Sequence, residues 1–239
     1  MTRRFAYFPV ALASAAGCAK AFRLEPHQYL AELERCRSKL LEDWNSRVKT
    51  AGDYPHEFFQ VMHVTCQRLA EGQHAVTVME LLRMLAFVDP CDIPITLFEH
   101  LRRHLPVLTE HCLVTVSSAG AHVSMHALTQ QVLREHLMGN ASNHALAAAT
   151  AQVRARMDEF DPSKHGTFAA GRRYAPHAKA VLSHADAPAS PDVAHLALQL
   201  GRFYRDVVIE FDDARRMLER SLSVWRALGT AEESEEVAH

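Results

Sequence analysis

Residues 112–130 read CLVTVSSAGAHVSMHALTQ, and this stretch decides the fold. Two short apolar runs, 113–116 and 122–125, flank the turn-forming segment 117–120, which ends in glycine. Two such runs separated by a short loop that contains glycine are typical of a β-hairpin. We therefore predict a two-stranded hairpin at this point, the one convincing strand signal in the sequence.

Helix-period patterns lie on both sides of the hairpin. Apolar residues recur at three- and four-residue spacing in four segments: 58–69, 76–88, 97–105 and 126–137. Gly139 and Asn140 then supply a helix stop. Because the apolar face of a hairpin needs helices to cover it, three helices, a hairpin and a returning helix predict a winged-helix arrangement over residues 56–139.

Composition favours helices in the rest of the chain as well. The sequence has only 9 glycines in 239 residues, while Ala and Leu are abundant, so we predict a mainly α fold. Pro9 and Pro26 each stand at the start of a helical pattern, where proline is favoured. Few large apolar residues occur in segment 45–55, so a domain boundary is expected near residue 56.

Charge and cysteine content limit the classes of partner. The net charge is -2, without the clusters of Lys and Arg that nucleic acids and anionic membranes attract, so neither partner is expected. The 5 cysteines are odd in number and widely spaced, which argues against a disulfide framework and for a reducing compartment. We predict a cytoplasmic protein.

The amino terminus leaves a second possibility open. Arg3 and Arg4 precede an apolar run, 5–16, and the sequence Ala-Ala-Gly-Cys at 15–18 imitates a lipoprotein signal. Under that interpretation residues 1–18 are a signal peptide and the protein is exported. The alternative is a buried helix that begins just after Pro9. A membrane-spanning helix is excluded, because it needs about 20 apolar residues and this run is shorter.

Several motifs, taken in order, resemble the carboxyl part of the NB-ARC, or STAND, signal-transduction ATPases that carry tetratricopeptide repeats. These are Phe8-Pro9-Val10-Ala11-Leu12, Tyr29 to Leu33, Leu81 to Pro94, Met125 to Gln130, Tyr174 to Ala178, and Leu200-Gly201 with Tyr204, Phe211 and Ala214. Tyr7 occupies a position that is glycine in the family, and Ala127 replaces an aspartate.

The resemblance implies four parts and a division of labour among them. They are an incomplete ARC-like helical subdomain (1–55), a winged-helix-like domain (56–139), a helical linker (140–190) and a tetratricopeptide-like helical hairpin (191–239). In such proteins the winged helix relays the nucleotide state to the repeats, which bind a protein partner. His126 would be the residue that senses the nucleotide phosphate, and Pro9 would belong to the motif that opens the ARC helix.

The ATPase core itself is missing from the sequence. No Gly-x-x-x-x-Gly-Lys-[Ser/Thr] phosphate loop is present, so the chain is not expected to be an enzyme or to hold a cofactor. The resemblance implies ADP or ATP only if the chain is joined to an upstream ATPase domain, and oligomerisation only in that full-length context.

The predicted repeat also has a physical basis. Two antiparallel helices approach closely where Gly201 and Ala214 are small, while Tyr204, Phe211 and Leu218 are expected to fill the seam between them. Between the helices the sequence is one residue longer than the usual pattern, with Val208-Ile209 where one glycine is customary. We therefore expect an altered turn.

Other candidate sites are weaker. His100 and His104 have helical spacing but lack a third ligand and the intervening glutamate of a zinc hydrolase, so no metal site is expected. His111 and Cys112 are adjacent, and adjacent residues on a helix point in different directions, so no thiol nucleophile is expected. A DNA-binding winged helix would need a basic recognition helix, but segment 126–137 contains one fixed cation, Arg134.

Overall fold

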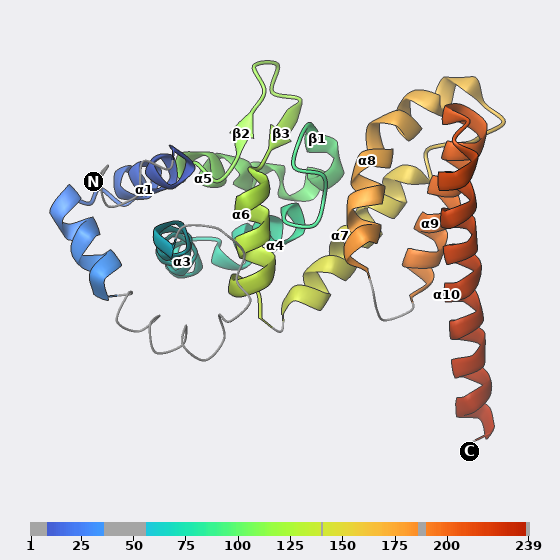
Figure 1. Cartoon of the computed structure of the whole chain (residues 1–239). Coiled ribbons are helices and arrows are strands. Elements are labelled where there is room, and N and C mark those ends of the chain that lie inside the picture. The colour runs from blue at the N-terminus through green and yellow to red at the C-terminus, as the bar shows by residue number, and fades with distance from the viewer. Residues whose placement is uncertain (1–8, 36–55, 140, 186–189, 238–239) are drawn as a thin grey trace. The chain divides into compact units, whose positions relative to one another are not determined.

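The computed structural model of the protein describes residues 9–35, 56–139, 141–185 and 190–237 (Figure 1). The described chain is mainly helical, as predicted, with three short strands. It divides into two compact units. Unit 1 consists of Met1–Ala86 with Glu99–Gly139, and unit 2 of Phe87–Phe98 with Asn140–His239.

Unit 1 begins with helices that bury small and aromatic side chains. Helix α1 (Pro9–Ala21) packs on α3 (His56–Glu71), and residues 26–35 form a further helix. Ala11, Ala15 and Cys18 are buried along one side of α1. Helix 26–35 adds Tyr29 and Leu33 to the same core. Residues 1–8 and 36–55 lie outside the described part of the chain. They include Tyr7 and the segment 45–55 on which the predicted boundary near residue 56 rests.

The rest of unit 1 consists of short elements in close succession. They are α4 (Ala75–Leu85), the carboxyl part of the 3-10 helix η2 (Ile95–His104), α5 (Leu105–Glu110), β2 (Thr115–Val116), β3 (His122–Ser124), α6 (Ala127–Val132) and the π-helix η3 (Leu133–Leu137). Helix η2 is kinked at Phe98 (φ -125°, ψ 46°), and the division between the two units falls at this kink.

The predicted hairpin is confirmed. Strands β2 and β3 pair antiparallel, with Thr115 opposite Ser124 and Val116 opposite Val123 (Figure 1). Gly120 takes φ 65° in the loop, a conformation that glycine adopts without steric cost. The strands are shorter than the apolar runs predicted, since Leu113 and Val114 are buried in the core before the pairing starts.

Helix α6 returns to the carboxyl end of α4. The Gln130 side-chain amide donates to the Leu85 carbonyl at 2.8 Å, and the Arg134 guanidinium donates to the Ala86 carbonyl. The last carbonyls of a helix have no intrahelical partner, so these two side chains supply the missing donors and fix α6 to α4.

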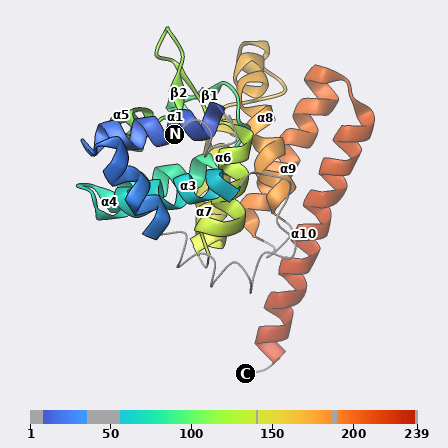
Figure 2. The same cartoon turned by 60° about the vertical axis from the view of Figure 1, so that its left-hand side comes forward.

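Unit 2 is built from longer helices that pack side by side (Figures 1 and 2). After strand β1 (Ile93–Pro94), its elements are α7 (Ala141–Met157), the 3-10 turn η4 (His165–Thr167), α8 (Phe168–His184), α9 (Pro191–Phe203), the π-helix η5 (Tyr204–Val208) and α10 (Phe211–Val237).

Segment Phe87–Phe98 belongs to unit 2, although it lies inside the range predicted as the winged-helix domain. The Thr96 hydroxyl lies 3.0 Å from the Tyr174 hydroxyl of α8, and Arg156 of α7 donates to the Thr96 carbonyl at 2.6 Å. The Phe87 ring also meets the His184 ring edge-on at 5.7 Å. These contacts join residues far apart in the sequence, so no local pattern indicates them.

Candidate functional site

His126, the predicted nucleotide sensor, caps the amino terminus of α6. Its backbone is extended (φ -61°, ψ 133°), and its Nδ1 accepts a hydrogen bond from the Leu128 amide at 3.1 Å. The prediction that His126 stands at the junction of the hairpin with the returning helix is therefore confirmed. Its sensing role stays a prediction.

The cap determines what the imidazole can do chemically. Because Nδ1 accepts, the neutral ring carries its proton on Nε2. The side chain is exposed, so it presents one neutral N–H donor to its surroundings. Met125 before it and Gln130 after it are both buried, which holds the junction in place.

The side chain of Arg134, the fixed cation of the returning helix, is already hydrogen-bonded within unit 1. Its guanidinium donates to the Ala86 carbonyl, and burial lowers its pKa from the ordinary value. A side chain that closes the end of α4 in this way is not presented to a DNA phosphate.

Pro9, the other residue taken from the family motif, is the first residue of α1, whereas the helix was predicted to begin just after it. It is exposed, while the helix that it opens contacts α3 and α5 within unit 1. His126 lies at the other end of the sequence of unit 1 elements, at the start of α6, and no contact between Pro9 and His126 is recorded among the described residues.

The seam between α9 and α10 contains the close approach that the repeat pattern predicts. A Cβ placed on Gly201 would lie 2.8 Å from Cγ of Leu218 and 3.3 Å from the Ala214 carbonyl oxygen. Ala214 is buried, and the buried Ser221 hydroxyl donates to the Ala194 carbonyl at 2.8 Å. The packing of Gly201 on Ala214 is therefore confirmed.

The prediction that Phe211 fills this seam is wrong. Its side chain is 65% exposed, and Tyr204 lies half-buried in the π-helix η5 and not on a facing helix. The Glu210 amide bonds the Tyr204 carbonyl at 3.0 Å, six residues back, so the turn is wider than usual. Phe211 consequently precedes the start of the seam at Ala214.

The turn does differ from the usual one, as expected, and the structure shows how. Ile209 adopts a left-handed conformation (φ 63°), which glycine takes at this position without steric cost. A β-branched residue in that region is strained. Ile209 is also 65% exposed, so burial of its side chain does not offset the strain.

Three exposed apolar residues of α10 form a surface that we call the α10 strip: Phe211, Leu222 and Trp225. Their spacing places them within about 60° of one another around the helix. They border the seam, where Trp225 meets the His195 ring edge-on at 5.4 Å. This strip was not predicted from the sequence. The signal that could have indicated it is the spacing of its members, 11 residues and then 3, which places them on one side of a helix.

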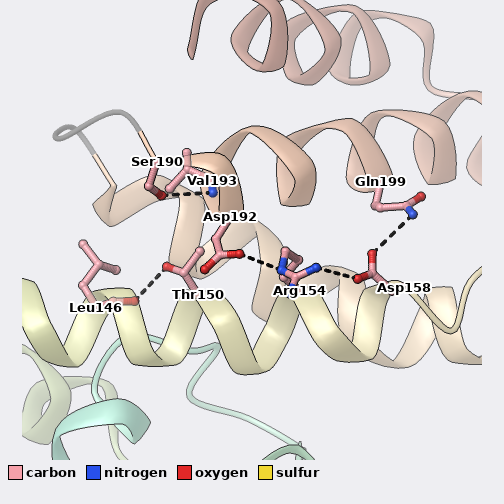
Figure 3. Close-up of polar contacts among 8 residues, drawn as sticks. All are labelled: Leu146, Thr150, Arg154, Asp158, Ser190, Asp192, Val193 and Gln199. Carbon is pink, nitrogen blue, oxygen red and sulfur yellow. Dashed lines mark hydrogen bonds and ion pairs between the residues drawn. The ribbon is translucent and has the colours of Figure 1, made fainter. Parts of the chain in front are cut away.

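Polar contacts hold α9 against α7 (Figure 3). Arg154 of α7 lies between two carboxylates, with its Nε 2.8 Å from Asp192 and its Nη1 2.9 Å from Asp158. Asp158 also accepts from the Gln199 amide at 3.4 Å. All three charged side chains are about one-third exposed or more, so each pair contributes little to stability. The arrangement orients α9 and holds no nucleophile.

Of the two histidines with helical spacing, His100 and His104, the structure shows how His104 is bonded. Nε2 of the buried His104 accepts from Nε of Arg103 at 3.1 Å, so that nitrogen is already engaged. Across the described ranges there is no group of three or more His, Cys, Asp or Glu side chains that could hold a metal ion. Asp213 pairs with Arg216.

Comparison with known proteins yields no match to a family model, to a curated protein or to a solved structure. No helix in the described part of the chain is long and apolar enough to cross a bilayer.

Proposed function

We propose that this chain is a non-catalytic regulatory and protein-interaction module of the NB-ARC, or STAND, type, and that its unit 2 recognises a protein partner. The observation that carries the proposal is the α9–α10 hairpin, which buries Gly201, Ala214 and Ser221 in its seam and leaves the α10 strip exposed. Contiguous apolar side chains on a surface favour an interaction site.

The tetratricopeptide interpretation accounts for that exposed strip. A helical hairpin of this type cannot bury both faces alone and relies on a stacked neighbour or a ligand. The close approach at Gly201 supports the likeness to such a hairpin. The π-helix η5 and the left-handed Ile209 depart from it at the turn.

The winged-helix interpretation assigns a relay to unit 1. The order α3, α4, α5, hairpin and α6 is the one that this arrangement requires, and His126 sits where the hairpin passes into the last helix. A capped imidazole with an exposed Nε2–H can donate one hydrogen bond to a phosphate oxygen. Gain or loss of that bond would be transmitted through α6 to α4, because Gln130 and Arg134 join the two helices.

One such bond cannot hold a nucleotide. A charge-assisted hydrogen bond contributes about 1.5 to 3 kcal/mol, whereas micromolar affinity requires about 8 kcal/mol. Calorimetry of the chain with ADP and magnesium should therefore give no saturable heat in the micromolar range. A micromolar isotherm abolished by His126→Ala would contradict the proposal, since it would reveal a nucleotide site within this chain.

Two alternatives have less support. A DNA-binding regulator would use the basic side chain of the returning helix, but Arg134 is engaged with Ala86. Export with cleavage before Cys18, as at a lipoprotein site, would take Ala11 and Ala15 out of the core of unit 1. Recovery of Ala11 in the mature protein by mass spectrometry supports the cytoplasmic interpretation, and a mature chain that begins at Cys18 contradicts it.

Recognition by the α10 strip can be tested with matched variants. Leu222→Ser with Trp225→Ser removes the apolar surface of α10, and Val76→Ser with Val116→Ser makes a similar change at exposed apolar positions of unit 1. We expect proteins cross-linked to the wild-type chain in its own cell extract to be lost with the first pair and retained with the second. Equal recovery with both pairs contradicts the proposal.

A further inference from the structure

Helix α5 has a buried histidine at each end. His104 is its amino-terminal cap and His111 its carboxyl-terminal cap, and each side chain is 3% exposed. Between them Leu105 and Leu108 are buried. Isolated buried histidines are common. Here a buried histidine lies at each end of a helix of only six residues, so the packing of that helix on its neighbours depends on the charge of both imidazoles.

The amino-terminal histidine is surrounded by potential cations. Nε2 of His104 accepts from Nε of Arg103 at 3.1 Å, which requires that this nitrogen carry no proton. Its ring lies 5.4 Å from the ring of His74, the residue that precedes α4. Among the described residues, Arg103 and His74 are the charged or titratable groups that act on it, and neither is a carboxylate that would compensate a proton on His104.

The carboxyl-terminal histidine lies in an apolar contact with the end of α1. The ring of His111 lies 4.8 Å from the ring of Phe22, and its backbone adjoins Gly17 of α1. Its buried Nδ1 has no hydrogen-bond partner among the described residues. In the described ranges Glu110 is the charged group that acts on it, and it does not bond Nδ1, so a proton on Nδ1 would place an unpaired N–H donor in the core.

We propose that α5 is an acid-releasable latch: neutral His104 holds it to the start of α4, neutral His111 holds it to the end of α1, and protonation of the two imidazoles releases it. The contacts named here all join residues of unit 1, so the release is expected in that unit. The proposal is independent of any nucleotide relay through His126.

The direction of the pH effect follows from the site. Burial, together with Arg103 and His74, lowers the pKa of His104 below its ordinary 6.5, and burial lowers the pKa of His111. The unfolded chain therefore binds these protons more readily than the folded chain. The stabilising contribution is complete above about pH 6.5 and is lost as the pH falls below that value towards the folded-state pKa.

Hydrogen exchange of wild-type protein at about pH 7.5 and about pH 5.5, corrected for the chemical exchange rate, tests the latch directly. We expect the protection of the α5 amides to fall by about tenfold or more at the lower pH, while α7 and α9, whose histidines are exposed, keep theirs. Unchanged protection of α5 at the lower pH would overturn the proposal.

Substitutions separate the two buried histidines from the others. His104→Gln with His111→Gln keeps polar, uncharged side chains at both ends, and we expect its α5 protection to be the same at both pH values. The control pair, His27→Gln with His100→Gln, changes two exposed histidines of unit 1 and should behave as wild type. Retention of the acid response in the His104/His111 pair would overturn the proposal.

If the buried pair does not fold, titration of the wild-type imidazoles by NMR replaces it. Both His104 and His111 should titrate below the ordinary histidine pKa of 6.5, together with the loss of α5 protection. Titration of either residue at or above that value would overturn the latch, as would protonation that leaves α5 protected.

Discussion

Two glycines, one in each unit, allow close approach of helices, but they face different kinds of atoms. A Cβ on Gly17 of α1 would lie 2.8 Å from Sγ of Cys112, and it would also meet two backbone atoms, the His111 carbonyl carbon at 2.9 Å and the Glu110 carbonyl oxygen at 3.0 Å. A Cβ on Gly201 of α9 would meet mainly the Leu218 side chain, at 2.8 and 2.9 Å. Side chains can change rotamer, whereas a backbone held by its own hydrogen bonds cannot. The two units should therefore respond differently to one added methyl group.

The largest effect is expected for Gly17→Ala. The added Cβ would have to displace the backbone at the end of α5, so the free energy of unfolding of unit 1 should fall by about 3 kcal/mol, at the upper end of the cost of overpacking. Urea unfolding followed by circular dichroism measures this loss. Gly229→Ala is the matched control, because its Cβ meets no atom within 4 Å and a helical alanine stabilises by up to about 1 kcal/mol.

A smaller loss is expected for Gly171→Ala in unit 2. Its Cβ would lie 2.6 Å from Cδ2 of Phe203 and 3.1 Å from Cδ2 of Phe160. Those two rings already pack edge to face at 5.5 Å, so they can shift only slightly. We expect a loss of about 2 kcal/mol in urea unfolding followed by circular dichroism. If Gly171→Ala lost more unfolding free energy than Gly17→Ala, packed aromatic rings would accommodate an added methyl group less well than backbone atoms do.

Ile209→Gly should raise the free energy of unfolding, whereas the two glycine substitutions above should lower it. Glycine takes the left-handed conformation of Ile209 without strain, and the isoleucine side chain is exposed, so little burial is lost. We expect the variant to unfold with a free energy about 1 kcal/mol higher than wild type. Val208→Gly, one residue earlier within η5, should instead lower it by about 1 kcal/mol. Destabilisation by both substitutions would contradict the assignment of strain to Ile209.

Gly201→Ala should have the smallest effect. The methyl group meets Leu218, which is only half-buried and can move, and the helix gains up to about 1 kcal/mol from alanine. We expect a net change of less than about 1 kcal/mol in the same urea experiment. A loss as large as that for Gly17→Ala would remove the distinction between side-chain and backbone neighbours.

Local patterns were sufficient for several elements and for one candidate residue. The hairpin is predicted by two apolar runs around a glycine-containing loop, and the start of α1 by Pro9. His126 is placed correctly because the change from strand to helix period occurs within a few residues. The contact of Gly201 with Ala214 follows from small residues at matching positions of two neighbouring helices.

Other features depend on residues that are distant in the sequence. The exposure of Phe211 depends on the π-helical turn, in which the Glu210 amide reaches back to Tyr204. The assignment of Phe87–Phe98 to unit 2 depends on Tyr174 and Arg156, about sixty residues or more further along. His100 and His104 look alike in the sequence, yet one is exposed and the other buried.

The sequence by itself determined that the chain is mainly helical, that a hairpin precedes a helix capped at His126, and that α9 and α10 can approach at Gly201. These features follow from hydrophobic period, turn residues and side-chain size, which act over a few neighbouring residues. The tertiary structure alone decided which histidines are buried, what each glycine faces and which apolar side chains stay exposed. Burial is a property of the packed chain, because it depends on which distant segment covers a side chain, and no local pattern specifies that segment.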